Sequence, residues 1–141
     1  MIERTLILLK PDAFQRNLDK ELIIRMFQES AIRGYKIALL CKFFNIPKAT
    51  IEKHYEEHKD KKFYGQLIDF MMEGFITAIV IEGEGSVEGM RNIAMKIRDQ
   101  YGVEKERNLI HSSDSIEAGD RECRNIFGEM INALEEKWVD Y

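Results

Sequence analysis

The clearest β segment of the chain reads Phe75-Ile76-Thr77-Ala78-Ile79-Val80-Ile81. β-Branched residues dominate it, and Gly74 before it and Glu82-Gly83-Glu84-Gly85 after it are typical of strand boundaries. A second apolar run, Thr5-Leu6-Ile7-Leu8-Leu9, ends at Lys10-Pro11-Asp12, where the proline cannot continue a central strand. The two runs therefore predict buried strands over residues 75–81 and 5–9.

The rest of the chain alternates between helical and strand patterns. Apolar residues at helical spacing predict a helix from Leu18 to Arg33, with Gly34 as its stop. A last strand is predicted over residues 108–111, and Gly119 and Gly128 are weak points of the helix that follows it. The remaining patterns predict a strand over residues 35–44 and helices over residues 47–58, 62–72, 86–97 and 116–138.

This order of elements predicts the fold class. A strand, a helix, a strand, a helical pair, a strand, a helix, a strand and a helix make two interleaved β-α-β units. We expect an α+β sandwich of ferredoxin-like type, in which a four-stranded antiparallel sheet carries its helices on one face. No linker or repeat interrupts the sequence, so a single domain over residues 1–141 is predicted.

Composition narrows the class of protein. The chain has 141 residues, of which 45% are hydrophobic and 33% charged, as in folded globular domains. No apolar segment is long enough to cross a bilayer, and the first residues lead into a strand pattern rather than a signal peptide, so we expect a cytoplasmic protein without a membrane partner. Cys41 and Cys123 lack metal-ligand spacing, which favours free thiols. The net charge of -4 argues against nucleic acid as the main partner.

One histidine stands where a strand pattern gives way to a turn. Leu109 and Ile110 are apolar residues of strand type, so the backbone that reaches His111 is expected to be anchored in the core. Asp114 and Ser115, which follow, are helix-capping residues, and a helix start favours bound phosphate. A neutral imidazole is a nucleophile near neutral pH and can pass on a phosphoryl group that it has accepted. A histidine that packs in a polar turn is the alternative from this stretch alone.

Several motifs line up in order along the chain. They are Lys10-Pro11-Asp12-Ala13 after the first strand, His54-Tyr55 with residues 61–67, Glu82-Gly83 after the third strand, and Asn108-Leu109-Ile110-His111-Ser112-Ser113-Asp114-Ser115. Together they resemble the nucleoside diphosphate kinase family, over almost the whole chain. The resemblance implies a ferredoxin-like core and an enzyme that transfers the γ-phosphoryl group of a nucleoside triphosphate, normally ATP, to a nucleoside diphosphate. It also implies Mg²⁺ as a cofactor and a phosphohistidine intermediate.

The resemblance implies catalytic roles for five residues at matching positions. His111 corresponds to the phosphorylated nucleophile, and Lys10 corresponds to the lysine that contacts the transferring phosphate. Tyr55 matches a tyrosine beside the phosphate site, with a hydroxyl that can donate a hydrogen bond. Glu122 matches the glutamate that orients the imidazole, and Ser113 matches the serine that bonds to it. A carboxylate on one ring nitrogen fixes the tautomer, which is what a histidine nucleophile needs.

Nucleotide binding is implied for a second set of residues. Arg91 and Arg98 match two phosphate-binding arginines, and planar guanidinium groups suit phosphates because they donate hydrogen bonds in pairs. Asn108 matches the asparagine that hydrogen-bonds the sugar hydroxyl. Phe63 and Leu67 match the apolar shelf under the base, a contact that tolerates any base. No protein ligand for a metal is implied, since Mg²⁺ is expected to be held mainly by the nucleotide phosphates.

The chain departs from the family pattern at two places. Arg91 and Arg98 are only seven positions apart, whereas the family has a long loop between these arginines, with a threonine that touches phosphate. The short spacing predicts a more open nucleotide site, and it leaves the expected homo-oligomer open between hexamer, tetramer and dimer. At the second face of the base slot the family commonly has an apolar residue, where this chain has Lys105 or a neighbour in a run of acidic and basic residues, so a different base preference is expected. Glu57 lies where the family has an acidic residue near the site.

Other interpretations fit parts of the sequence. A catalytically weak nucleotide-binding or regulatory homologue would keep the fold and lose turnover, although the matched site residues argue against it. A phosphocarrier or a histidine-dependent phosphatase would also use His111. His54 and His58, four positions apart on an expected helix, have a spacing that can hold a metal, but surface histidines explain this segment better.

Overall fold

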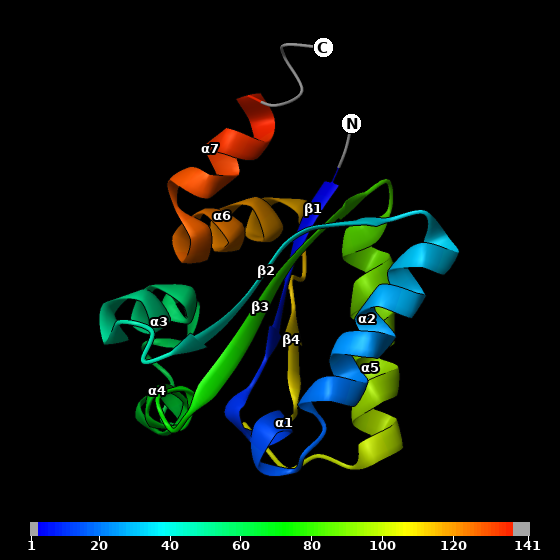
Figure 1. The fold of residues 1–141 in the computed structure, drawn as a ribbon. Coiled ribbons are helices and arrows are strands. Elements are labelled where there is room, and N and C mark those ends of the chain that lie inside the picture. The colour runs from blue at the N-terminus through cyan, green and yellow to red at the C-terminus, as the bar shows by residue number, and fades with distance from the viewer. Residues whose placement is uncertain (1–2, 137–141) are drawn as a thin grey trace.

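The sheet has the predicted architecture. In the computed structural model, which describes residues 3–136, the strands lie in the order β2-β3-β1-β4. All pairings are antiparallel, and β1 pairs with both β3 and β4. The α+β fold of ferredoxin-like type is therefore confirmed (Figure 1). The strands are β1 (Glu3–Leu9), β2 (Lys36–Phe44), β3 (Phe75–Gly83) and β4 (Ile110–Ser112).

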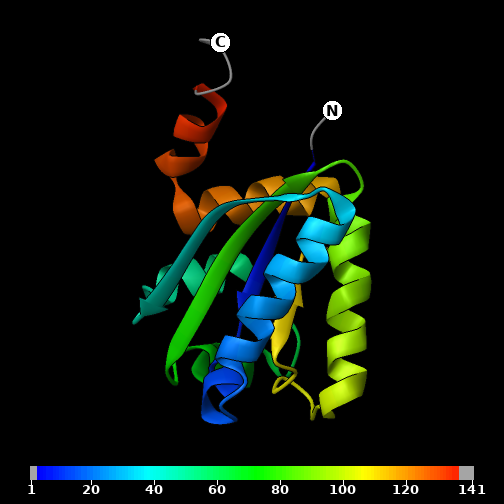
Figure 2. The same ribbon diagram turned by 45° about the vertical axis from the view of Figure 1, so that its right-hand side comes forward.

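The helices cover both faces of the sheet, which corrects the expectation of one covered face. α2 and α5 lie on one side, and α3, α4 and α6 lie on the other (Figure 1 and Figure 2). Within residues 3–136, no helix has both the length and the apolar composition needed to cross a membrane. The bounds of these helices and of the short α1 are α1 (Pro11–Gln15), α2 (Asp19–Arg33), α3 (Lys48–His54), α4 (Tyr64–Met71), α5 (Ser86–Tyr101) and α6 (Ile116–Phe127).

The continuous apolar run of β1 explains why both faces are covered. Leu6 and Leu8 belong to a core that α3, α4 and α6 complete, whereas Ile7 and Leu9 belong to a second core that α2 and α5 complete. Successive side chains of a strand point to opposite faces, so the apolar run from Leu6 to Leu9 has to be buried on both sides of the sheet. The resulting two layers of helices place α3 and α6 beside one face of β4, where the candidate site lies.

Two predicted helices are shorter than their patterns suggest. The helix expected to continue to residue 58 ends at His54, and a 3-10 turn over Glu56–His58 follows it. The helix expected over residues 116–138 is broken at Gly128, where φ is 57°, and continues as α7 (Glu129–Glu136). The last two residues of that prediction lie outside the described part of the chain. The break follows from the left-handed backbone at Gly128, which a helix cannot contain.

α6 packs closely on β1 at Gly119. An ideal Cβ atom on Gly119 would lie 2.1 Å from the carbonyl oxygen of Arg4, far inside van der Waals contact. Glycine at this position therefore allows the helix backbone to approach the strand, and it is a packing requirement rather than a weak point of the helix. This approach matters for the site because α6 also carries Glu122.

The residue before β4 has an unusual backbone. Leu109 is fully buried, but its φ is 70°, so β4 begins only at Ile110 and the predicted strand starts two residues too early. A left-handed conformation at a bulky residue is strained and needs support from its surroundings. Asp12 Oδ2 accepts from the Leu109 N–H at 3.0 Å, and the backbone N–H of Lys10 donates to the Leu109 carbonyl at 2.9 Å. The segment after β1 thus holds the backbone just before His111.

Replacing Asp12 by alanine is expected to lower the free energy of unfolding by about 1–3 kcal/mol, because the buried N–H of Leu109 loses its acceptor. Urea denaturation measures this change. Asp12→Asn keeps an acceptor oxygen and should retain most of the stability. An alanine variant as stable as the wild-type protein would show that the backbone of Leu109 does not need this support.

Candidate functional site

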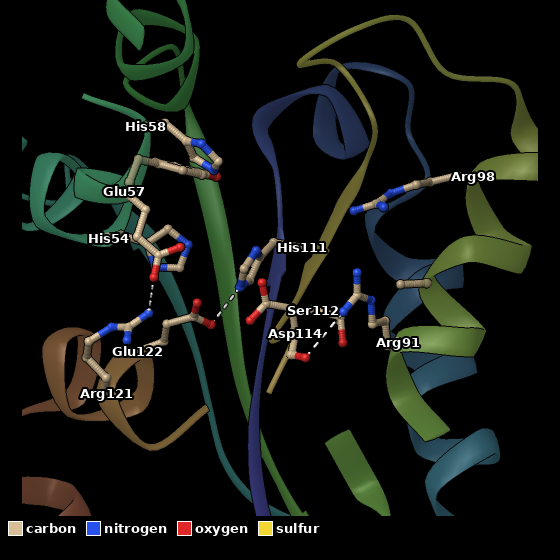
Figure 3. A pocket seen from close by; sticks show the side chains of 12 residues that line it. His54, Glu57, His58, Arg91, Arg98, His111, Ser112, Asp114, Arg121 and Glu122 are labelled. Carbon is tan, nitrogen blue, oxygen red and sulfur yellow. Dashed lines mark hydrogen bonds and ion pairs between the residues drawn. The ribbon is translucent and has the colours of Figure 1, made fainter. Parts of the chain in front are cut away.

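His111 lies on β4 with a carboxylate bound to one edge of its ring. Nε2 of His111 is 2.8 Å from Oε1 of Glu122, and the hydroxyl of Ser113 donates to the same oxygen at 2.7 Å. The oxygen of that hydroxyl accepts from the backbone N–H of Leu6 at 3.0 Å, which ties the group to β1. Figure 3 shows Glu122 and His111 turned toward each other. With Nε2 donating its proton to the carboxylate, Nδ1 keeps the lone pair of the neutral ring.

The start of α6 brings Glu122 back to His111. The hydroxyl of Ser115 accepts from the N–H of Ala118 at 3.0 Å, so this serine caps α6, in place of the carboxylate cap that Asp114 was expected to provide. Burial alone would raise the pKa of Glu122, but the hydrogen bond and charge of His111 outweigh this effect, and the net pKa is lowered. The carboxylate is therefore ionised at neutral pH and can balance a positive charge on the ring.

Lys10 is buried just beyond the end of β1. Its ammonium group donates a hydrogen bond to Oδ1 of Asn108 at 2.7 Å. Burial, followed by the charge of Arg98, lowers the pKa of Lys10 to about 8. A buried ammonium group that meets a neutral amide gains more from an anion than a solvated one, so this lysine suits a phosphate.

Arg91 and Arg98 project from α5 about two helical turns apart. Arg91 donates to the carbonyl of Asp114 at 3.2 Å, and Arg98 donates to the carbonyl of Ile110. The two arginines thus contact the backbone on either side of His111, and with it they line a cavity of about 210 Å³. A continuous helix spans both arginines, in place of the long loop of the family pattern.

A second cavity, of about 610 Å³, meets the first at His111. Tyr55 and Arg98 also line both cavities. Phe63 exposes 45% of its surface, which leaves an aromatic face for stacking, whereas Leu67 is buried. The size suits a small organic ligand, and Arg98 lines the cavity together with the histidine. Its other lining residues include Lys10, Gln66, Lys105, Glu106 and Asn108.

The predicted site residues come together around these cavities. Nine of the ten line at least one cavity, and Ser113 is buried behind Glu122. The hydroxyl of Tyr55 has no hydrogen-bond partner among residues 3–136. Burial raises the pKa of Tyr55, so the hydroxyl stays protonated and can donate to a ligand.

Two further side chains at the site do not follow from the sequence reasoning. His54, expected on the surface, lies against His111 with ring centroids 4.6 Å apart, and both of its ring nitrogens are shielded from solvent. Arg121 forms an ion pair with Glu57 at 2.9 Å, and both line the smaller cavity. The position of His54 next to Tyr55, a predicted site residue, could have indicated that His54 belongs to the site. Whether its ring faces His111, however, depends on where α3 ends.

This chain is similar in sequence to proteins of one family. Residues 3–131 match the family described as nucleoside diphosphate kinase. The nucleoside diphosphate kinase of Streptomyces avermitilis is 42% identical over 137 residues, which cover 90% of this chain and 97% of that protein. The nucleoside diphosphate kinase of Staphylococcus haemolyticus is 41% identical over 138 residues, which cover 91% of this chain and 89% of that protein.

Solved structures show the same likeness. The nucleoside diphosphate kinase of Aquifex aeolicus superposes with a TM-score of 0.79 at 31% identity, over 92% of this chain and 98% of that one. The enzyme of Halobacterium salinarum, solved in complex with CDP, also has a TM-score of 0.79 at 31% identity, over 91% of this chain and 89% of that one. The similarity therefore extends over nearly the full length of the fold.

Proposed function

Because this chain belongs to the nucleoside diphosphate kinase family and is a nucleoside diphosphate kinase, we propose that its phosphoryl transfer passes through a phosphohistidine at His111. The pairing of Nε2 with Glu122 at 2.8 Å carries this proposal, because it leaves Nδ1 as the nucleophilic nitrogen. His111 also lies where the two cavities meet. A nucleotide that occupies both would bring its phosphates to the ring, which removes most of the entropic barrier to attack.

The two half-reactions use the same groups in opposite directions. In the first, the lone pair of Nδ1 forms a bond to the γ-phosphorus of ATP while the bond to the bridging oxygen breaks, and ADP leaves with that electron pair. Glu122, supported by Ser113, balances the positive charge that the ring gains. In the second, a terminal phosphate oxygen of another nucleoside diphosphate takes the phosphoryl group from His111, and the neutral ring is restored.

Cationic side chains hold the phosphates in this proposal. Lys10 contacts the transferring phosphate, and Arg91 and Arg98 contact the phosphates that are not transferred. Their present partners support these roles, because both arginines donate to neutral backbone carbonyls and keep further N–H groups for an anion. The unpartnered hydroxyl of Tyr55 adds a donor at the same place.

The larger cavity would hold the nucleoside. Oδ1 of Asn108 accepts from Lys10, so the amide group of Asn108 is free to donate to a sugar hydroxyl. Phe63 and Leu67 offer the apolar shelf under the base. Lys105 lines the same cavity with φ of 52°, and this charged residue supports a base preference that differs from the family pattern.

Kinases of this family need a divalent metal, and we propose Mg²⁺. Asp114 and Glu57 place carboxylate oxygens at the smaller cavity, and oxygen is the ligand type that Mg²⁺ prefers. Glu57 already pairs with Arg121, which leaves Asp114 as the more available donor beside the nucleotide phosphates. Bound to those phosphates, Mg²⁺ supplies neutralisation of charge on the transferring group.

An intact-mass measurement tests the phosphohistidine. Protein mixed with ATP and Mg²⁺ should gain one phosphoryl group, and a nucleoside diphosphate should then remove it. The group should be acid-labile and should pass only slowly to water, which separates the kinase from a phosphatase that uses the same histidine. Transfer between nucleotides without any gain of mass by the protein would contradict the proposal.

The value of kcat/KM is expected to fall as the pH rises above about 8. The sign follows from the pKa of Lys10, which burial lowers to about 8: below this pH the ammonium group is charged and attracts phosphate, and above it the amine is neutral. The Lys10→Gln variant should be slower throughout and should lack this falling limb. If the limb remains in the variant, the pKa belongs to another group.

We also propose a homo-oligomer, for which hexamer, tetramer and dimer remain open. β2 is an edge strand that exposes Leu40 and Phe44, and the neighbouring α2 exposes Ile24, Phe27 and Ile32. Edge strands pair readily, and adjacent exposed apolar side chains are typical of protein interfaces. Sedimentation velocity should give a multiple of the chain mass, and a stable monomer at micromolar concentration would contradict this proposal.

We further propose that residues 1–141 form one domain and that the protein works in the cytoplasm. The family match covers residues 3–131 as one stretch. Cys41 and Cys123 are both free thiols, as is usual in reducing compartments. Subcellular fractionation of the source cells tests the location.

A further inference from the structure

Three side chains that can bind a metal converge beside the nucleophile. His54 comes from α3, His111 from β4 and Glu122 from α6, and one nitrogen or oxygen atom of each lies within 4.8 Å of the others. Figure 3 shows His54 and Glu122 next to the ring of His111. The three residues form what is called here the His-His-Glu cluster.

His54 is the member of the cluster that the proposed phosphoryl transfer does not use. Both of its ring nitrogens are shielded from solvent, and neither has a hydrogen-bond partner within residues 3–136. Buried polar atoms are normally paired, so two unpaired nitrogens in one ring call for a ligand. Burial also lowers the pKa of His54 to about 3, which keeps the ring neutral. A neutral imidazole with a free lone pair is the form that binds metal ions.

We propose that the His-His-Glu cluster binds a transition-metal ion of the Zn²⁺ type in the unphosphorylated, nucleotide-free protein, and that this ion blocks phosphorylation of His111. Two imidazoles and one carboxylate suit Zn²⁺, which commonly takes three protein ligands and leaves a fourth position open. Mg²⁺ prefers oxygen and does not compete for the imidazoles. The blocking role rests on the proposed function, whereas binding of the ion does not.

Metal binding changes the tautomer of His111. In the metal-free protein, we assign the ring proton to Nε2, which donates to Glu122 at 2.8 Å. A metal bonded to Nε2 takes the place of that proton, and the proton moves to Nδ1, so the neutral ring neither gains nor loses a proton overall. Nδ1 then has no lone pair for the γ-phosphorus. The ion therefore blocks phosphorylation, and by reciprocity a phosphorylated ring, whose Nε2 proton is held by Glu122, binds the ion more weakly.

The cluster needs only small movements to bind an ion. Nε2 of His111 and Oε1 of Glu122 are 2.8 Å apart, whereas two ligand atoms on a tetrahedral Zn²⁺ lie about 3.4 Å apart. The wider separations, at most 4.8 Å, have to shorten by rotation of the His54 ring, which packs edge-on against His111. The cluster borders the cavity of about 210 Å³, which leaves room for a fourth ligand.

Positive charge in the same cavity opposes the binding of a metal ion to the His-His-Glu cluster. Arg91, Arg98 and Arg121 line the cavity, and a cation has to bind against their charge. Glu57 offsets part of it through its ion pair with Arg121 at 2.9 Å. An anion such as chloride in the fourth position of the metal would offset more. We therefore expect tighter metal binding in chloride than in a buffer whose anions do not ligate metals.

Co²⁺ is the probe for the first half of the proposal, because it occupies Zn²⁺ sites and its visible absorption reports tetrahedral coordination. Chelator-treated, unphosphorylated protein should bind one Co²⁺ per chain, and Zn²⁺ should displace it. His54→Gln should weaken binding at least about tenfold, and the matched control His58→Gln, outside the cluster, should not. Wild-type protein without a tetrahedral spectrum, or His54→Gln with unchanged affinity, would overturn the proposal. If His54→Gln does not fold, phosphorylated wild-type protein replaces it and should bind Co²⁺ at least about tenfold more weakly than the unphosphorylated form; equal affinity of both forms would overturn the proposal.

Intact mass tests the second half. Zn²⁺ added before ATP and Mg²⁺ should prevent the gain of a phosphoryl group by the wild-type protein, whereas His54→Gln should still gain it at the same Zn²⁺ concentration. Equal phosphorylation of the wild-type protein with and without Zn²⁺ would exclude the blocking role. If no form gains mass while the wild-type protein binds Co²⁺, the phosphohistidine is wrong and the metal site stands.

Discussion

Replacing His111 by alanine is expected to reduce phosphoryl transfer between nucleotides by at least about 10³-fold. In the proposed reaction the imidazole supplies the nitrogen that bonds to phosphorus, and a methyl group cannot replace it. A steady-state assay with ATP and a second nucleoside diphosphate measures the loss. Because the His111 side chain is largely buried on the short strand β4, far-UV circular dichroism should accompany the assay to show that the variant is folded.

Two further variants define the role of the histidine. Glu122→Gln keeps the size of the side chain but cannot balance a positive ring, so a loss of about 10–100-fold is expected. His58→Ala removes another histidine that lines both cavities, and its turnover should stay within about tenfold of the wild-type value. Turnover that survives in His111→Ala would refute the nucleophile. Slow turnover of the wild-type protein itself would instead favour the catalytically weak homologue.

Gly119→Ala is expected to lower the free energy of unfolding by about 3 kcal/mol or more. The new Cβ atom would lie 2.1 Å from the carbonyl oxygen of Arg4, and neither atom belongs to a flexible side chain that could turn away. α6 would have to move off β1, which also displaces Glu122 from His111. Urea denaturation gives the loss of stability, and a fall in the rate of phosphorylation should accompany it.

Gly65→Ala is the matched control. Gly65 also lies in a helix, α4, but nothing is within 4 Å of the position of its Cβ atom. Alanine favours helix over glycine, so this variant should be unchanged or more stable by up to about 1 kcal/mol. If Gly119→Ala is as stable as Gly65→Ala, the close approach of α6 to β1 is not a requirement of the fold.

The strands could be predicted because their signal is local. The runs that became β1 and β3 are apolar along nearly their whole length, and such runs form buried strands wherever they lie in the chain. The same pattern shows that helices have to bury the apolar side chains on both faces of β1. The expectation of a single layer of helices was wrong because it followed from the order of the elements, and it ignored that Leu6 to Leu9 place apolar side chains on both faces of β1.

Most of the candidate site could also be predicted, because its residues occur in motifs that resemble one family. The same matching could not place His54 beside His111, since the position of its ring depends on the end of α3 and on the packing of that helix against α4 and α6. It also missed the backbone of Leu109. Nothing in a leucine indicates a positive φ, which here depends on the distant carboxylate of Asp12.

The amino-acid sequence by itself determined the order of the elements, the buried strands and the motifs that contain the candidate site residues, because these depend on short-range patterns. Only the tertiary structure decided that Gly119 admits a helix onto Arg4, and that His54 completes a possible metal site at the nucleophile. Each of these features is a contact between segments far apart in the chain. Such contacts depend on how two distant segments pack against each other, and the sequence of one segment alone does not show the shape of the other.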